Sequence, residues 1–260
     1  MRELADPVDV RAVEALFTDL WQARAGHPPL SADVMRSLAH FGGYVAGAYA
    51  GNMLVGACVG FLGAGHEPYL HSHITGVSPQ VQGRGVGYAL KCDQRAWALE
   101  HGIPMINWTF NPLVRRNGFF NLVRLGAVAT SYLVDFYGEM TDGINAGQGS
   151  DRLVAVWSAG TPARPPATEA TVDTLITQGR VLLDVDAAGA PEPGDAAGRD
   201  RGDSPLLCRM PADIEALRAD DPALAREWRS AVRGMMAPAI DDGYRVTSAT
   251  RSGWYLLEAS

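Results

Sequence analysis

Apolar residues recur at helical spacing near the start of the chain. The repeat comprises Val10, Val13, Phe17, Leu20 and Trp21. It predicts a helix over residues 7–25 with one apolar face. Asp6-Pro7 supplies an N-cap followed by a proline at the first helical position. A second, short helix, capped by Ser31, is expected to follow.

Apolar runs further along the chain predict a series of strands interrupted by two helices. The expected strands span 44–50, 53–62, 69–77, 105–110, 127–136 and 153–158, and the expected helices span 83–101 and 112–125. This order is typical of an α/β (α+β) fold with a mixed, mostly antiparallel central sheet flanked by helices. The strand-helix-strand unit from 69 to 110 should place two parallel strands in that sheet.

The composition changes after residue 159. Residues 160–205 are rich in Pro, Gly and Ala, and the part from 186 to 205 is expected to be a mobile loop. Beyond it, Asp221-Pro222 begins a predicted helix, and a hairpin closes the chain. We therefore expect a core at 1–159, a connector at 160–205, and a C-terminal β-α-β extension whose helix and hairpin at 206–260 pack on the core or on a dimer partner.

Composition and charge narrow the class of protein. With 47% hydrophobic and 20% charged residues, a packed core is feasible. No apolar run approaches the ~18 residues that cross a bilayer, and the first residues do not resemble a signal peptide. The three cysteines, Cys58, Cys92 and Cys208, have no metal-ligand spacing. We therefore expect a cytoplasmic protein with no membrane partner, no disulfide frame and no metal.

The formal net charge of −7 argues against a nucleic-acid partner. It also means that any polyanionic ligand needs a focused positive site.

The most informative segment is Gln82-Gly83-Arg84-Gly85-Val86-Gly87, which follows the predicted strand end at Val77 and opens a predicted helix. Glycines let a ligand approach the backbone closely. The first-turn N–H groups of a helix and its dipole attract an anion. Arg84 and Lys91 are expected to add positive charge. The arrangement suits a pyrophosphate.

Three other kinds of structure are known to contain glycine-rich segments. A tight strand-to-helix turn with no ligand would carry the same glycines. The Walker pattern requires Gly-Lys-Ser/Thr, which is absent here. A dinucleotide site would place the loop after the first strand of a parallel run, with an acid ~20 residues further on.

The segment resembles the Gln/Arg-x-x-Gly-x-Gly/Ala signature of the GNAT superfamily of N-acetyltransferases, over roughly residues 2–157. By that resemblance, a coenzyme A thioester binds here as acetyl-CoA or succinyl-CoA. The resemblance implies that strand 105–110 splays away to leave a slot for the acyl group. The residues implied to bind the cofactor are Ile74, Gly76, Val77, Gln82, Gly83, Arg84, Gly85, Val86, Gly87, Tyr88, Asn117 and Asn121.

A narrower resemblance runs through nearly the whole chain. It is carried by His71-Ser72-His73, the run 108–113, Ser150-Asp151-Arg152 and Trp228-Arg229, among other segments. It points to a branch with a long C-terminal extension that is linked to N-acylation or N-succinylation of amino acids. Two departures stand out: Asn111 stands where that branch has Asp, and Leu122 stands near the tyrosine that the wider superfamily often uses as general acid.

Acyl transfer from a thioester needs a neutral amine, a polarised carbonyl and a proton for the leaving thiolate. His71 and His73 are the candidate bases, because they lie two apart on one strand and so share a face. Each has a structural role as its alternative. Trp108 and Phe110 are candidate walls of the acyl slot, or else core residues. Four residues in all are candidate contacts to the substrate: Trp108, Phe110, Asn111 and Arg116.

Asn111 and Arg116 also have simpler interpretations, as a helix cap and as a solvated charge. The favoured function is transfer of an acetyl or succinyl group to the amine of a small molecule, an amino acid or a derived metabolite, by direct attack in a ternary complex. A non-catalytic acyl-CoA sensor or structural subunit and a peptide N-acyltransferase are the alternatives. A homodimer is left open.

Overall fold

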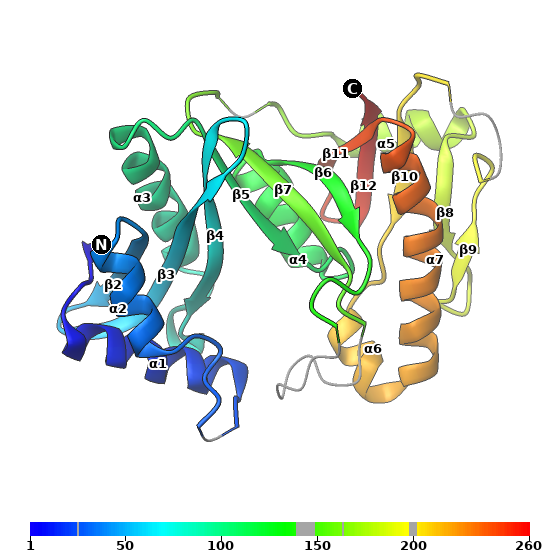
Figure 1. Ribbon diagram of the computed structural model, residues 1–260. Helices are drawn as coiled ribbons and strands as arrows, with labels where there is room; N and C mark the ends of the chain where they lie inside the picture. Colours follow the sequence, from blue (N-terminus) through cyan, green and yellow to red (C-terminus); the bar gives the residue numbers. More distant parts are fainter. Residues whose placement is uncertain (25, 139–148, 163, 198–201) are drawn as a thin grey trace. The chain divides into compact units, whose positions relative to one another are not determined.

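The computed structural model describes residues 1–24, 26–138, 149–162, 164–197 and 202–260 (Figure 1). The described chain divides into two compact units. The first contains residues 1–108 and 158–161, and the second contains 109–138, 149–157 and 162–260. No described helix is long and apolar enough to span a bilayer.

The sheet of the first unit has the strand order β1-β2-β3-β4-β5. The strands are β1 (Arg2–Glu3), β2 (Tyr44–Ala50), β3 (Met53–Ala64), β4 (Pro68–Val77) and β5 (Met105–Phe110). Neighbours pair antiparallel except β4 and β5, which pair parallel. The predicted strand-helix-strand unit with two parallel strands is therefore confirmed.

Helices cover both faces of this first sheet (Figure 1). Helices α1 (Pro7–Trp21) and α2 (Ala32–His40) pack on one face, where Val13 and Phe17 join Val45 and Val59 in a buried cluster. Helix α3 (Val86–Glu100) contacts β2, β3 and β4 from the other face, where Trp97 meets the fully buried Tyr44 edge to face. Helix α1 ends four residues earlier than predicted, because Gln22 adopts a left-handed conformation.

Strand β4 contains a bulge. Opposite β3, Val59 faces Ile74 and Gly60 faces Ser72, so His73 is an extra residue without a cross-strand partner. Against β5, the pairing consists of Tyr69–Met105, Leu70–Ile106 and His71–Asn107. The β4–β5 ladder thus ends immediately before the bulge. A bulge bends its strand and re-aims a side chain.

The sheet of the second unit has the order β7-β6-β11-β12-β10-β8-β9. These strands are β6 (Val128–Leu133), β7 (Arg152–Ser158), β8 (Val181–Val185), β9 (Pro191–Pro193), β10 (Leu206–Arg209), β11 (Tyr244–Ala249) and β12 (Trp254–Ala259). Strands β8 and β10 pair parallel, and β11 and β12 form the predicted closing hairpin.

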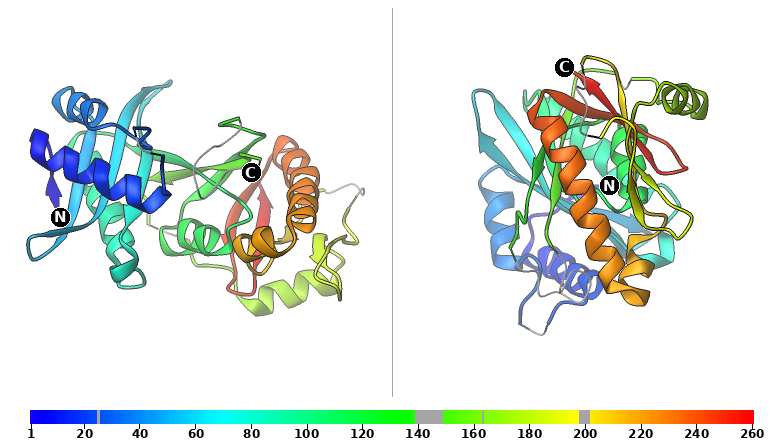
Figure 2. Two further views of the ribbon diagram at one scale, coloured as in Figure 1. Left: turned by 90° about the horizontal axis from the view of Figure 1, so that it is seen from below. Right: turned by 90° about the vertical axis from the view of Figure 1, so that its right-hand side faces the viewer.

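Helices α5 (Glu169–Thr177) and α7 (Pro222–Asp241) lie on opposite faces of this second sheet (Figure 2). Trp228 of α7 is fully buried and donates to the Gly189 carbonyl (2.9 Å). On the other face, Val172 and Leu175 of α5 pack with Trp254. The short α6 (Ile214–Asp220) precedes α7.

Two sequence expectations differ from the structure. The expected helix 112–125 is instead α4 (Arg115–Gly118) followed by the π-helix η2 (Phe119–Arg124). The stretch 160–205 contains α5, β8 and β9, and within the expected mobile loop β9 pairs with β8. Residues 163 and 198–201 lie outside the described residues. The boundaries at 159 and 205 stay a prediction.

Candidate functional site

The glycine-rich segment forms the amino end of α3. A 3-10 turn, η1 (Pro79–Val81), follows β4, and Gly83 and Gly85 then adopt φ values of 76° and 82°. This left-handed region favours glycine. Gly85 is the N-cap residue, and no side chain caps the helix. Gly83, Arg84 and Gly85 are exposed. The amino end of α3 therefore presents backbone N–H groups and the positive end of the helix dipole to solvent.

Other residues of the segment shape this end. The Gln82 side chain donates to the Val77 carbonyl (3.3 Å) and so ties the loop to the end of β4. A Cβ at Gly87 would lie 3.7 Å from a methyl group of Val77. Tyr88 is exposed in the first turn. A small, exposed, backbone-lined surface of this kind suits a phosphate group.

Lys91 does not belong to this surface, which corrects the expectation that it adds charge to the loop. It is 4% exposed, because the second turn of α3 faces the sheet. Its ammonium group donates to Ser72 Oγ and Gln94 Oε1, both at 2.8 Å, and lies 3.9 Å from the centre of the Trp108 ring. Burial lowers the pKa of Lys91 to about 8, and the Cys58 thiol opposes that change.

His71 and His73 lie on one face of β4, as their spacing predicts. Their ring centres are 6.2 Å apart, and both rings contact Phe61 of β3, at 5.0 Å and 5.8 Å. Nδ1 of His71 is 2.7 Å from Oδ1 of Asn107 on β5. Desolvation and then the neighbouring His71 lower the pKa of His73. His73 is therefore neutral at neutral pH and can accept a proton.

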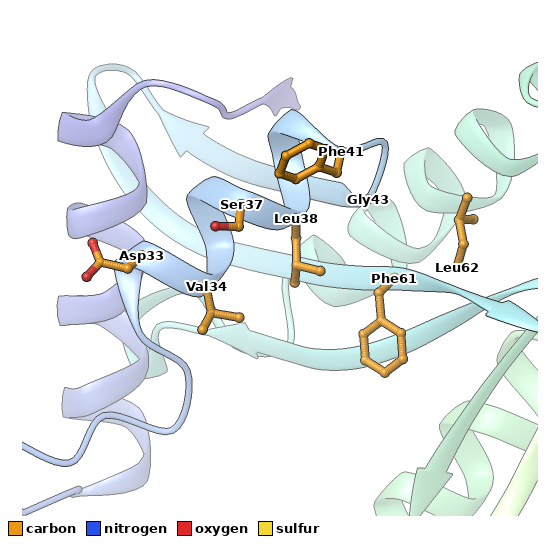
Figure 3. A pocket seen from close by; sticks show the side chains of 8 residues that line it. All are labelled: Asp33, Val34, Ser37, Leu38, Phe41, Gly43, Phe61 and Leu62. Carbon is orange, nitrogen blue, oxygen red and sulfur yellow. The ribbon is translucent and has the colours of Figure 1, made fainter.

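An apolar groove is lined in part by Phe61, the residue that both histidine rings contact. Figure 3 shows the side chains that line this groove. The groove has a volume of about 460 Å³. Its lining residues are Asp33, Val34, Ser37, Leu38, Phe41, Gly43, Phe61 and Leu62. Phe41 and Leu62 are 82% and 49% exposed, which is unusual for large apolar side chains. Sequence reasoning missed the groove, because it arises where the end of α2 meets the part of β3 that extends beyond β2.

The remaining predicted residues of the first unit pack inside it. Ile74 packs against the α1–α2 cluster. A Cβ at Gly76 would come within 2.7 Å of a Leu20 methyl group, so a larger residue here would force side chains of α1 to shift. Trp108 is buried on β5, beside Lys91. Ile74, Gly76 and Trp108 thus pack inside the first unit, and their predicted contacts to a ligand stay a prediction.

The other candidate residues belong to the second unit. Phe110 is buried. Asn111 Oδ1 accepts from the Leu113 amide (3.1 Å). The expected helix cap is not formed, because α4 begins only at Arg115 with Val114 as its N-cap residue. Asn117 is exposed, and Asn121 is buried in η2. Their predicted part in cofactor binding stays a prediction.

Arg116 makes a two-point ion pair with Glu215, including Nη2–Oε1 at 2.7 Å. It lines a cavity of about 500 Å³ together with Arg115, Phe119 and Arg251. Because its guanidinium already has a carboxylate partner within the chain, a substrate carboxylate would have to displace Glu215. No group of His, Cys, Asp and Glu suited to a metal occurs among the described residues.

Comparison with known proteins finds solved structures that resemble this chain in fold but share little of its sequence. No family model and no curated protein matches the chain. It is similar to the structure of yncA from Salmonella typhimurium, a proposed acetyltransferase solved with its cofactor acetyl-CoA, at a TM-score of 0.50 and 15% identity, covering 64% of this chain and 97% of that one.

Two further solved structures match. For the GNAT-family acetyltransferase of Streptococcus pneumoniae, the TM-score is 0.47 and the identity 15%, over 61% of this chain and 98% of that one. For an aminoglycoside 6'-acetyltransferase type Ii, the TM-score is 0.48 and the identity 16%, over 63% of this chain and 98% of that one. The likeness to yncA shows that this chain shares the fold of that protein, which here consists of a mostly antiparallel sheet flanked by helices.

Proposed function

We propose that this protein is an acyl-CoA-dependent N-acyltransferase that acts on the amine of a small molecule. The observation that carries the proposal is the amino end of α3, which is exposed, rich in glycine and without a side-chain cap. It directly follows the strand whose pairing with β5 ends at His71. In the fold shared with yncA, which was solved with acetyl-CoA, such an end suits the pyrophosphate of the cofactor.

The chemistry assigns a task to each part of the first unit. The backbone amides at the start of α3 hold the pyrophosphate, and the pantetheine arm follows β4. The amine nitrogen attacks the thioester carbon, the C–S bond breaks, and the thiolate takes up a proton. His73, with His71 beside it, accepts the proton that the amine loses. Its lowered pKa keeps it neutral for this step.

The groove beside Phe61 is the proposed place for the apolar part of the acceptor. An amino acid or a derived metabolite with an apolar side chain would place its amine toward the histidines and its side chain against Phe41 and Leu38. The acyl group is acetyl or succinyl, and the donor panel below separates the two.

The test is thermal stabilisation of the wild-type protein by coenzyme A, acetyl-CoA and succinyl-CoA, with ATP as the comparison ligand. A ligand at ~100 times its Kd adds about 2.7 kcal/mol of stability, which raises Tm measurably. We expect a coenzyme A thioester to raise Tm more than ATP does. No rise with any thioester would overturn the proposed function.

The donor with the largest shift is then incubated with a panel of amino acids and small amines, and thiol release is measured. Thiol release that depends on an amine identifies the enzyme. Binding without turnover would instead favour a non-catalytic acyl-CoA sensor, a reading supported by Leu122, a buried apolar residue near the position of the superfamily's tyrosine acid.

A further inference from the structure

Helix α3 carries a buried cation within the first unit. Lys91 is 4% exposed, and its ammonium group meets Ser72, Gln94 and the Trp108 ring at hydrogen-bond or cation–π distance. Its contacts give it no carboxylate partner among the described residues. A lysine in such surroundings needs an explanation, because burying an ammonium group is unfavourable unless it is paired.

The place of the ammonium group in the sheet is specific. The ladder between β4 and β5 ends at the pair His71–Asn107. Ser72 is the next residue on β4, and Trp108 is the next on β5. Lys91 therefore contacts the first residue beyond the ladder on each strand. We call the point where the two strands cease to pair, marked by Ser72 and Trp108, the strand fork.

The surroundings of Lys91 do not favour stability. Gln94 turns its carbonyl oxygen to Lys91, and its buried amide nitrogen is left without a hydrogen-bond partner in the described structure. An unsatisfied buried donor destabilises a fold. Even a buried ion pair can often be replaced by apolar side chains of similar volume at no cost in stability, and Lys91 has no carboxylate to compensate its burial. Stability alone therefore gives no reason for a lysine at this position.

We propose that Lys91 is a positioning residue that holds the strand fork open and so shapes the stretch of β4 and β5 that receives the pantetheine arm of acyl-CoA. The ammonium group contacts the Ser72 hydroxyl and the Trp108 ring face, so it fixes the two side chains relative to each other at the point where the ladder ends. The bulge at His73 follows directly on β4. This inference rests on the proposed function, because it assigns part of the same site.

The test compares two ligands on three proteins by isothermal titration. Acetyl-CoA contains the pantetheine arm, and adenosine 3′,5′-bisphosphate lacks it. The variant is Lys91→Met, which keeps the length of the chain and removes the charge. The control is Arg95→Met on the same helix, whose guanidinium donates to the Ala159 and Thr161 carbonyls away from the strand fork. Urea unfolding of each protein accompanies the titrations.

For Lys91→Met we expect acetyl-CoA to bind at least about tenfold more weakly, because the stretch of β4 and β5 that contacts the pantetheine arm would be misplaced. The Kd of adenosine 3′,5′-bisphosphate should change less than about twofold, because this ligand lacks the pantetheine arm. Arg95→Met should leave the Kd of both ligands unchanged.

Equal acetyl-CoA affinity in the wild type and Lys91→Met would overturn the proposal. A parallel loss of both affinities together with a lower urea midpoint would also overturn it, since that is the signature of a purely structural lysine. Failure of the wild type to bind acetyl-CoA is a different result, which removes the proposed function itself.

Discussion

Helices α3 and α7 begin in opposite ways. At α7, the Asp221 carboxylate accepts from the amides of Ala223 and Leu224 at 3.1 Å and 3.0 Å. At α3, Gly85 offers no side chain, and none caps the helix. Among the described helices of seven or more residues, α3 alone begins without a side-chain cap. The other described helices of this length are thus capped by a side chain of the chain itself, and the start of α3 is left open.

The same contrast extends to the titratable groups of the two units. Asp151 in the second unit has no exposed surface and accepts hydrogen bonds from Tyr132, the Asp135 amide and both nitrogens of the Arg233 fork. His73 in the first unit is exposed at a bulge. Groups satisfied within the chain stabilise it, whereas groups left accessible are available to a ligand.

The largest effect is expected for His73→Gln. If His73 accepts the proton of the amine, its loss lowers kcat/KM by about 100- to 10,000-fold. In the wild type, kcat/KM should rise with pH through a midpoint below the ordinary histidine pKa of about 6.5, because the pKa of His73 is lowered. His101→Gln is the control, since that ring caps the Trp97 carbonyl at the far end of α3. Unchanged activity in His73→Gln would show that His73 is not the base.

The next largest effect is on stability. Asp151→Asn leaves the Arg233 guanidinium without its buried carboxylate and should destabilise the protein by about 3 kcal/mol. Burial alone would raise the pKa of Asp151, but hydrogen bonds from Arg233, the Asp135 amide and Tyr132 lower it overall.

Because the folded pKa of Asp151 is below the unfolded value of about 3.9, its contribution is complete above that value and is lost as the pH falls through the folded pKa. Urea unfolding between pH 7 and pH 2.5 measures how the contribution of Asp151 to stability changes with pH. The difference between the wild type and Asp151→Asn should shrink below pH 4, and a constant difference would contradict the assignment.

Gly85→Glu places a carboxylate at the open start of α3. It should weaken acetyl-CoA binding by at least about 100-fold, or ~2.7 kcal/mol, because the added charge and side chain occupy the anion site. Gly102→Glu is a matched control at the other end of α3. Both glycines have a positive φ, 82° and 69°, and open space around a Cβ, so each variant adds one carboxylate to a left-handed position without a steric clash. Equal loss in the two variants would mean that strain and not site blockage is measured.

The smallest effect is expected at the capped helix. Asp221→Ala removes the two bonds at the start of α7 and should destabilise the protein by about 1 kcal/mol without changing the acetyl-CoA Kd. Thermal unfolding measures the loss of stability, and titration measures the acetyl-CoA Kd. A change in acetyl-CoA affinity would break the distinction between a structural and a functional helix start.

Local patterns predicted the parts of this protein that depend on neighbouring residues. Strand β5 was predicted at its observed bounds, and Asp221-Pro222 marked the start of α7. The glycine spacing predicted the open start of α3, and the spacing of His71 and His73 predicted their shared face.

Features that depend on distant segments were not predicted. The bulge at His73 exists only in the register with β3. Lys91 was expected to add positive charge at the loop, yet it lies on the buried face of α3 together with Leu90, Gln94 and Trp97. The spacing of these residues along the helix could have indicated that Lys91 is buried. The cap at Thr168 and the apolar Val172 and Leu175 could likewise have indicated α5.

The most direct test of the central claim follows the backbone amides of the isotope-labelled protein by NMR as coenzyme A is added. If the open start of α3 binds the pyrophosphate, the largest chemical-shift changes should occur at the amides of residues 83–88, and Gly85→Glu should abolish them. The amide signals of residues at the start of α7 should keep their chemical shifts. Changes confined to other parts of the chain, or none at saturating coenzyme A, would contradict the account.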